Sequence, residues 1–219
     1  MECRKADGWG AQLRPEFRGE CWHSQDGKRG GVPRECGFPA WKLIGVDFLS
    51  YNPPGTTGAG PFRVTNPGHF LFQKPNRVDV KKGDRFGIDL NNPTRQVLDD
   101  EGDVRVSTIM KTVAGPIPEG APVDLTDPPG IDVIAEGFYD CEEVGEKAFY
   151  FDYYHREVPH EQSRHQDVGC EMIYWERHDG GRVFSASTIS AGWPLADDTR
   201  WSDLLKNVLH HFGVPSTHG

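Results

Sequence analysis

The sequence predicts an α/β fold, a strand-rich mixed sheet with a C-terminal amphipathic helix packed on it. Three observations predict this fold. Short apolar and aromatic runs of strand length recur between residues 41 and 189. An Asp-Gly turn separates the last two of these runs. A single apolar stripe with helical spacing then follows between residues 199 and 212.

The first predicted strand is residues 41–51, a run dense in apolar residues that ends at Pro53-Pro54-Gly55. Five later runs of the same character predict strands at residues 104–113, 131–135, 148–157, 170–177 and 182–189. The intervening residues 52–68 and 114–130 are rich in proline or glycine and predict loops. Residues 178–181, His-Asp-Gly-Gly, predict a hairpin because Asp-Gly readily adopts the positive φ angles of a tight turn.

The helix near the C-terminus has apolar residues at i, i+3, i+4, i+7, i+8 and i+11, namely Trp201, Leu204, Leu205, Val208, Leu209 and Phe212. Asp198 or Thr199 is suited to cap its start, and Gly213 is suited to end it. We therefore expect one apolar face packed on the sheet.

Composition excludes some classes of function. The 219 residues carry 33 acidic and 24 basic side chains, a net charge of −9, which argues against a nucleic-acid surface and against docking on anionic lipid. No segment approaches 18 consecutive apolar residues, so we expect no membrane span. The five cysteines form no C-x-x-C pair and fit reduced thiols in the cytoplasm.

The chain divides into two parts. Residues 1–37 are polar, glycine-rich and without periodicity, and they predict an extended N-terminal segment. Residues 38–219 predict a single α/β domain. The N-terminal segment is unlike the start of an independent domain, so we expect the domain to be truncated relative to its relatives.

Four blocks of residues occur in the order found in a known family. The first block is His23-Ser24-x-x-Gly27-x-x-Gly30-Gly31 with residues 42–48, and the second is His69-Phe70-Leu71-Phe72 with Gly83-Asp84-x-Phe86-Gly87. The third block is residues 131–135 with Glu136-Gly137. The fourth block is Met172-Ile173-Tyr174-Trp175-Glu176 with Gly180-Gly181-x-Val183-Phe184-Ser185 and Asn207-Val208-Leu209-x-x-Phe212. On these residues the chain resembles the C-terminal region of the N,N-dimethylformamidase large (beta) subunit family, over roughly residues 20–213.

The resemblance implies a fold like that of class I glutamine amidotransferases. It also implies a hydrolase (an amidase) that cleaves the C–N bond of a small amide substrate, with iron held by tyrosine and carboxylate side chains. We expect a homo-oligomer or a companion subunit, because further ligands would come from another chain or an upstream segment.

Two departures favour an alternative, a non-catalytic interaction domain that keeps the fold without the metal site. Lys28 stands where family members often have a glutamate, and a cation there would repel a metal ion. The family's ligand tyrosines lie upstream of the first block, whereas residues 1–22 contain no tyrosine.

Glu136 is the first candidate catalytic residue, because it directly follows an apolar strand and precedes a glycine. At the carboxyl end of a strand it would act as general base or support a metal. The competing interpretation is a salt-bridging glutamate at a strand end. His23 is the second candidate, since its pKa lies near neutrality and it could orient a water molecule. A loop histidine bonded to the backbone is the favoured interpretation of His23.

Two other patterns favour structural roles. His155, His160 and His165 recur every five residues, a spacing that suits neither one helix face nor one strand face, so a solvated loop is the better interpretation. The aromatic residues 149–154 would offer phenolate ligands, but a strand with one buried face explains them as well. His210 and His211 are adjacent on the predicted helix, so their rings should point apart.

Overall fold

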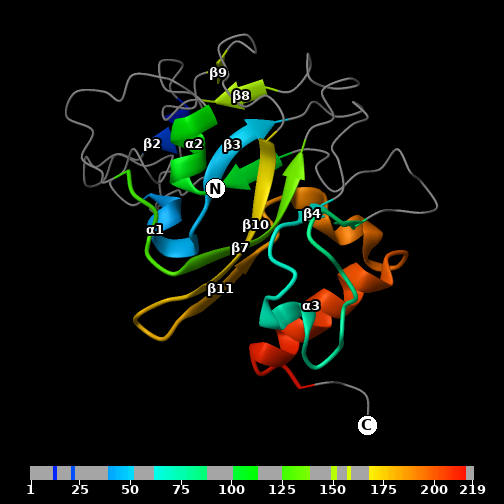
Figure 1. Ribbon diagram of the computed structural model, residues 1–219. Helices are drawn as coiled ribbons and strands as arrows, with labels where there is room; N and C mark the ends of the chain where they lie inside the picture. The colour runs from blue at the N-terminus through cyan, green and yellow to red at the C-terminus, as the bar shows by residue number, and fades with distance from the viewer. Residues whose placement is uncertain are drawn as a thin grey trace.

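A computed structural model confirms an α/β fold with a strand-rich sheet and a C-terminal helix (Figure 1). It describes residues 12–13, 21–22, 39–51, 62–87, 101–112, 125–138, 149–151, 157–158 and 168–215. Among these residues, no helix is long and apolar enough to cross a membrane.

The larger sheet has five strands in the order β11-β10-β7-β4-β5. Their bounds are β4 (Phe62–Val64), β5 (Arg85–Phe86), β7 (Ile131–Phe138), β10 (Val168–Glu176) and β11 (Arg182–Ser185). Each neighbouring pair in this sheet is antiparallel, and so is every other strand pair in the described part of the chain. The prediction of a mixed sheet is therefore wrong. The predicted hairpin between β10 and β11 is confirmed, and Gly180 takes the left-handed φ of 89° that such a turn needs.

A smaller sheet has four strands in the order β6-β3-β8-β9. They are β3 (Asp47–Tyr51), β6 (Glu101–Val104), β8 (Phe149–Phe151) and β9 (Glu157–Val158). The single strand expected at 148–157 is therefore two short strands that pair with each other. In the N-terminal segment, β1 (Gln12–Leu13) pairs with β2 (Cys21–Trp22).

Two of the runs predicted as strands contain helices instead. The run at 41–51 starts as α1 (Ala40–Ile44), which ends where Gly45 adopts a φ of 85° and donates to the Trp41 carbonyl, before β3 begins. The run at 104–113 is mostly α2 (Val106–Thr112). Its buried Val106 and Ile109 are three residues apart, a spacing that places both on one helix face.

One part of the core lies between the larger sheet and α3 (Thr199–His211), with the short helices η1 (Phe70–Phe72) and η3 (Ile189–Leu195) beside it. The same cluster continues through Leu49, Val104 and Ile109 into β3, β6 and α2. The rings of Phe62, Phe86 and Trp201 pack with centroids 5.6–5.9 Å apart. Figure 1 shows α3 on the opposite side of β7 and β10 from α1 and α2. The predicted helix is thus confirmed, and the side chain of Asp198 caps it by accepting from the Arg200 amide.

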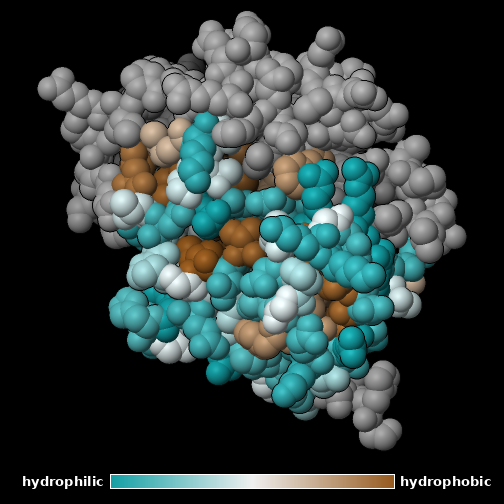
Figure 2. Space-filling view, viewed as in Figure 1, coloured by the Kyte–Doolittle hydropathy of each residue, from teal (hydrophilic) through white to brown (hydrophobic). Residues whose placement is uncertain are grey.

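The apolar stripe of α3 is only partly covered. Trp201, Leu204 and Val208 are buried, but Leu209 is 50% exposed and Phe212 is 40% exposed. In the view of Figure 2 the described surface is mostly hydrophilic, and hydrophobic residues show in separate patches. The covered face of the helix is therefore narrower than the sequence pattern suggested.

Candidate functional site

Glu136 lies inside a strand and not after one, because β7 continues to Phe138. Its neighbours in register are Glu171 on β10 and Arg63 on β4. Since these strands run antiparallel, the position is in the middle of the sheet and has no open carboxyl end. The prediction that Glu136 follows the strand is therefore wrong, and its side chain is half-buried.

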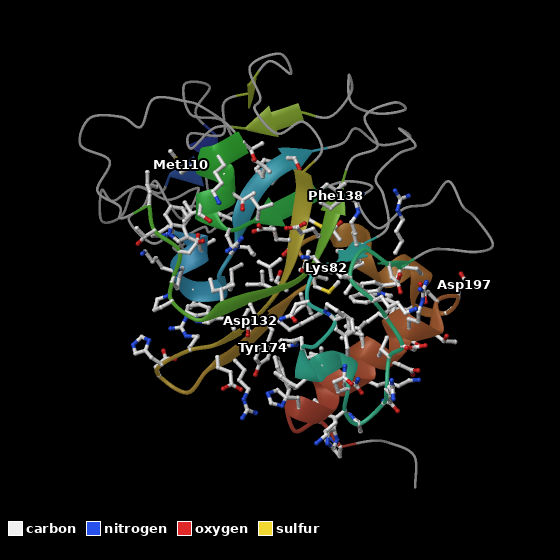
Figure 3. All side chains as sticks on the ribbon, in the orientation of Figure 1. Lys82, Met110, Asp132, Phe138, Tyr174 and Asp197 are labelled. Carbon is white, nitrogen blue, oxygen red and sulfur yellow. The ribbon has the colours of Figure 1, made fainter. Side chains whose placement is uncertain are left out.

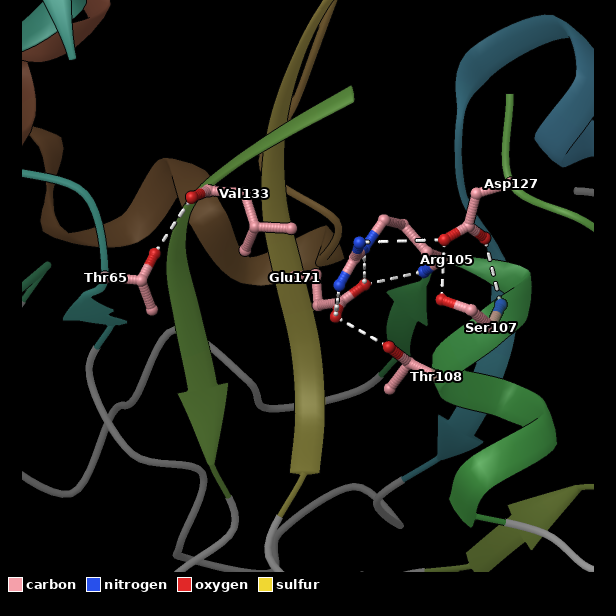
Figure 4. A network of polar contacts seen from close by, with 7 residues as sticks. All are labelled: Thr65, Arg105, Ser107, Thr108, Asp127, Val133 and Glu171. Carbon is pink, nitrogen blue, oxygen red and sulfur yellow. Dashed lines mark hydrogen bonds and ion pairs between the residues drawn. The ribbon is translucent and has the colours of Figure 1, made fainter. Parts of the chain in front are cut away.

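The partners of Glu171 show which face of the sheet Glu136 shares. Glu171 is buried and accepts hydrogen bonds from the Arg105 amide (2.8 Å), Nε (3.0 Å) and Nη2 (3.0 Å), and from the Thr108 hydroxyl (2.7 Å) (Figure 4). Asp127 completes this network through the amide and hydroxyl of Ser107. Directly opposed residues project to the same face, so Glu136 faces the α2 side with Glu171. The carboxylate of Glu171 is saturated with structural hydrogen bonds.

His23, the second candidate, lies outside the described residues, as do His155, His160 and His165. Of the aromatic residues 149–154, the backbone of Phe149–Phe151 forms β8. The roles predicted for these residues stay predictions.

The opposite face of the sheet bears a pocket that the sequence did not reveal. It is open to solvent, has a volume of about 510 Å³, and is lined by Phe70, Gly130, Asp132, Tyr174, Glu176 and His211. Tyr174 and Asp132 are opposite each other on β10 and β7, and their side chains lie together beside η1 and the end of α3 (Figure 3). The pocket thus draws on four segments far apart in the sequence.

A phenol stands between an imidazole and a carboxylate in this pocket. The Tyr174 hydroxyl donates to Glu176 Oε1 at 2.6 Å, and His211 Nε2 lies 2.7 Å from the same hydroxyl. Because the single phenol proton goes to Glu176, His211 must carry its proton on Nε2 and donate it to the phenol oxygen. His211 Nε2 is also 3.5 Å from Glu176 Oε1, so the three polar atoms form a compact triangle.

The charge states of this triangle follow from its surroundings. Burial, and then the hydrogen bond and charge of Glu176, raise the pKa of Tyr174 well above its ordinary value. The hydrogen bond from Tyr174 lowers the pKa of Glu176, with a smaller contribution from Arg182, whose Nε is 3.7 Å from Glu176 Oε1. Near neutral pH the phenol is therefore neutral and the carboxylate is charged.

His69 lies behind the pocket and is only 7% exposed. Its Nδ1 accepts from the Leu71 amide at 3.4 Å, which leaves the proton on Nε2. Nε2 has no hydrogen-bond partner among the described residues, and the nearest carboxylate oxygen, Asp132 Oδ2, is 3.7 Å away. Burial lowers the pKa of His69, although Asp132 opposes that shift, so the ring is neutral near pH 7.

The aromatic rings of the pocket meet at steep angles. Phe70 and Tyr174 have centroids 5.1 Å apart and planes at 85°. His211 lies 4.7 Å from Phe70 at 54° and 5.5 Å from Tyr174 at 67°. The three rings therefore form a corner rather than a stack.

The sequence contained a weak signal for this site. Tyr174 and Glu176 alternate along a strand, which places both side chains on one face. His211 was set aside because it is adjacent to His210, and the rings do part: His211 turns to the pocket, whereas His210 is exposed. Within the described residues, no group of three or more histidine, cysteine, aspartate or glutamate side chains is arranged to hold a metal ion. The phenol of Tyr174 supplies a third donor beside His211 and Glu176.

Comparison with known proteins identifies no relative: no family model matches the chain, and no curated protein matches it.

Proposed function

We propose that the chain is an amide hydrolase, or a subunit of one, as its resemblance to the N,N-dimethylformamidase large subunit implies, and that the pocket around Tyr174 is its active site. One observation carries the proposal: the Tyr174 hydroxyl is hydrogen-bonded to both Glu176 and His211 at the wall of an open cavity. Acid, base and relay groups in contact at a cavity are the arrangement that proton-transfer catalysis requires.

Three of the four blocks that carry the resemblance contribute residues to this pocket. Phe70 belongs to the second block, Asp132 to the third, and Tyr174 with Glu176 to the fourth. His211 lies within the helical stretch that closes the fourth block. This convergence supports a functional role for blocks that the sequence alone made look structural.

The side chains can divide the work of hydrolysis. Glu176 is charged and accepts a proton from water, whose oxygen then bonds to the amide carbon. Tyr174 stays protonated and can donate to the leaving nitrogen as the C–N bond breaks. Glu176 Oε1, 2.6 Å from the phenol oxygen, then returns to Tyr174 the proton it took from water, while His211 Nε2–H hydrogen-bonds to that oxygen and stabilises its transient negative charge.

The donor atoms of the pocket fit the iron that the resemblance implies. A phenol, a carboxylate and an imidazole lie within 3.5 Å of one another at Tyr174, Glu176 and His211. Bound iron would act as a Lewis acid that polarises the amide carbonyl. With iron bound, the phenol would lose its proton and His211 would carry its proton on Nδ1, so the proton-donor role of Tyr174 belongs to the metal-free pocket. Because the phenol must lose its proton to bind a metal, we expect the affinity for iron to rise with pH.

Three finer expectations belong to the same proposal. They are a glutamine amidotransferase-like sandwich, a companion subunit or homo-oligomer, and a cytoplasmic location. The last is supported by five cysteines without a C-x-x-C pair and by the buried thiol of Cys170.

The test is the release of amine from small tertiary formamides and acetamides by the purified chain, with and without ferrous iron. Replacing Tyr174 with phenylalanine should lower kcat/KM by about 10²-fold or more, because the relay loses its hydroxyl. The fold should survive, since the two hydrogen bonds of the hydroxyl contribute about 1 kcal/mol each.

A neighbouring pair of histidines provides a matched control. His211→Gln should lower turnover, whereas His210→Gln, which alters an exposed side chain on the next position of α3, should leave it unchanged. Equal effects from the two histidine variants would count against the pocket as the active site.

The second candidate is a non-catalytic interaction domain. It is favoured by three exposed apolar side chains near the end of α3, Leu209 (50% exposed), Phe212 (40%) and Val214 (48%). A wild-type chain that releases no amine with or without iron, yet binds a partner that Phe212→Ser abolishes, would support this candidate instead.

A further inference from the structure

The pocket combines carboxylates with aromatic rings and lacks basic side chains. Asp132 and Glu176 line it with side chains that are 57% and 59% exposed. None of the six described lining residues is a lysine or an arginine. An anionic ligand would therefore meet like charges at the pocket wall.

Among the residues that the structure describes, one of the two carboxylates has no cation to balance it. Glu176 is partly offset by Arg182, whose Nε lies 3.7 Å from Oε1. Among the described residues, the basic group paired with Asp132 is His69 at 3.7 Å, and burial keeps that ring neutral near pH 7. The pocket thus retains about one uncompensated negative charge, which suits a monovalent cation.

The rings add a preference for a cation that carries alkyl groups. Phe70 and Tyr174 meet nearly at right angles, and His211 closes the corner from the end of α3. Tyr174 is only 3% exposed, so the ring that this corner presents to solvent is that of Phe70, which is 38% exposed. An exposed aromatic face attracts organic ammonium ions through its negative charge and through contact with methyl groups. A hydrated metal ion gains little from such a face because it carries no apolar surface.

We propose that the pocket binds a small organic ammonium ion, with Asp132 facing its charge and the exposed ring of Phe70 contacting its alkyl groups. This binding does not depend on the proposed hydrolysis, because it involves no proton transfer. An alkylamine released from an amide would be one such ion.

The test compares two probes of the same shape, choline and its uncharged carbon analogue 3,3-dimethylbutan-1-ol, by calorimetry or by NMR titration. We expect choline to bind at least tenfold more tightly than the alcohol, a difference of about 1.4 kcal/mol. Equal affinity for the two probes, or no binding of choline, would overturn the proposal.

Single substitutions test where on the protein choline binds. Asp132→Asn should weaken choline binding about fivefold or more, and Phe70→Leu about three- to tenfold, since cation–aromatic contacts contribute about 0.5–2 kcal/mol. Asp79→Asn removes an exposed carboxylate that does not line the pocket and should change nothing. An equal loss of choline affinity in the Asp132 and Asp79 variants would show that the effect comes from net charge. It would contradict the assignment of Asp132 to the binding site.

One further variant separates this inference from the proposed hydrolysis. Tyr174→Phe keeps the ring and removes only the hydroxyl, so it should bind choline within about twofold of wild type. The same variant should lose amide turnover. If wild type binds choline but shows no turnover, the hydrolase proposal fails alone. If wild type shows turnover but does not bind choline, the ammonium proposal fails alone.

Discussion

Glu171 and Glu176 lie on the same strand, yet their surroundings give them different roles. Glu171 is buried and fully hydrogen-bonded to Arg105 and Thr108 on the α2 face. Glu176 is 59% exposed at the pocket and accepts a single short hydrogen bond from Tyr174. A carboxylate whose oxygens are fully hydrogen-bonded is held in place, whereas a partly exposed carboxylate beside titratable groups can exchange protons.

Replacing Glu171 with alanine should therefore destabilise the fold strongly. The guanidinium of Arg105 would lose its closest carboxylate in a largely buried setting, which costs about 3 kcal/mol or more. Urea unfolding followed by circular dichroism measures the loss. Asp79→Asn, at an exposed position, should change the free energy of unfolding by less than about 0.5 kcal/mol; a similar change in both variants would show that the network contributes little.

Acid should destabilise the protein through His69. Burial lowers its pKa below the ordinary 6.5, although Asp132 opposes the shift and His211 adds to it. The unfolded chain therefore takes up a proton at a higher pH than the folded chain does. The contribution of His69 to stability is complete above the ordinary pKa and is lost as pH falls below it.

His69→Asn tests this, because asparagine keeps an acceptor for the Leu71 amide and does not titrate. Urea unfolding at about pH 7.5 and about pH 5.5 should show a smaller acid loss in this variant than in wild type. His210→Asn, at an exposed position, should keep the wild-type difference between the two pH values. If the His69 variant lost as much free energy of unfolding in acid as wild type does, the acid sensitivity would not come from His69.

At the scale of elements, the position of the pocket depends on how α3 holds the segment before β5. Asn207 is fully buried on α3, and its amide nitrogen donates to the carbonyls of Leu71 and Asn76 at 2.7 Å each. Its oxygen accepts from the backbone and side chain of Asn76. This contact fixes η1, which carries Phe70 at the pocket wall.

Replacing Asn207 with leucine should cost about 3 kcal/mol, because buried carbonyl and amide groups lose their partners. The resonances of residues 69–73 should broaden or shift in NMR spectra, and choline binding should weaken with them. Lys206→Ala, which removes an exposed partner of Asp203 on the same helix, should cost less than about 0.5 kcal/mol. An Asn207 variant with unchanged spectra would show that η1 is held by other contacts.

At the scale of the whole molecule, the two sheets meet where glycines allow close approach. A Cβ at Gly102 on β6 would lie 2.0 Å from the Gly169 carbonyl oxygen and 2.7 Å from the Ser50 hydroxyl. The same hydroxyl donates to the Gly169 carbonyl at 3.2 Å. The junction of β3, β6 and β10 therefore has no room for a side chain at position 102.

Gly102→Ala should force β6 away from β10 and cost about 3 kcal/mol. Thermal unfolding followed by near-ultraviolet circular dichroism would show both the lower midpoint and the altered packing. Gly192→Ala is the matched control, because a Cβ there meets nothing within 4 Å. Equal stability of the two variants would mean that β6 can move away from β10 without loss of stability.

Elements with a local signal could be predicted from the sequence alone. The helical spacing from Trp201 to Val208 and the Asp-Gly turn at 179–180 were predicted correctly because each depends on neighbouring residues. The strand at 131–135 was also predicted, although it continues through Glu136 to Phe138. Glu136 was misplaced for that reason, since its Glu-Gly pair resembles a strand end.

The remaining features depend on the packing of the folded chain. The runs at 41–51 and 104–113 were predicted as strands, but they contain the helices α1 (Ala40–Ile44) and α2 (Val106–Thr112), because a short apolar run does not by itself distinguish a strand from a helix. The pocket joins Phe70, Asp132, Tyr174 and His211 from four distant segments. Periodicity reports which face of an element is buried, but it does not report which faces meet, because that depends on long-range packing of the whole chain.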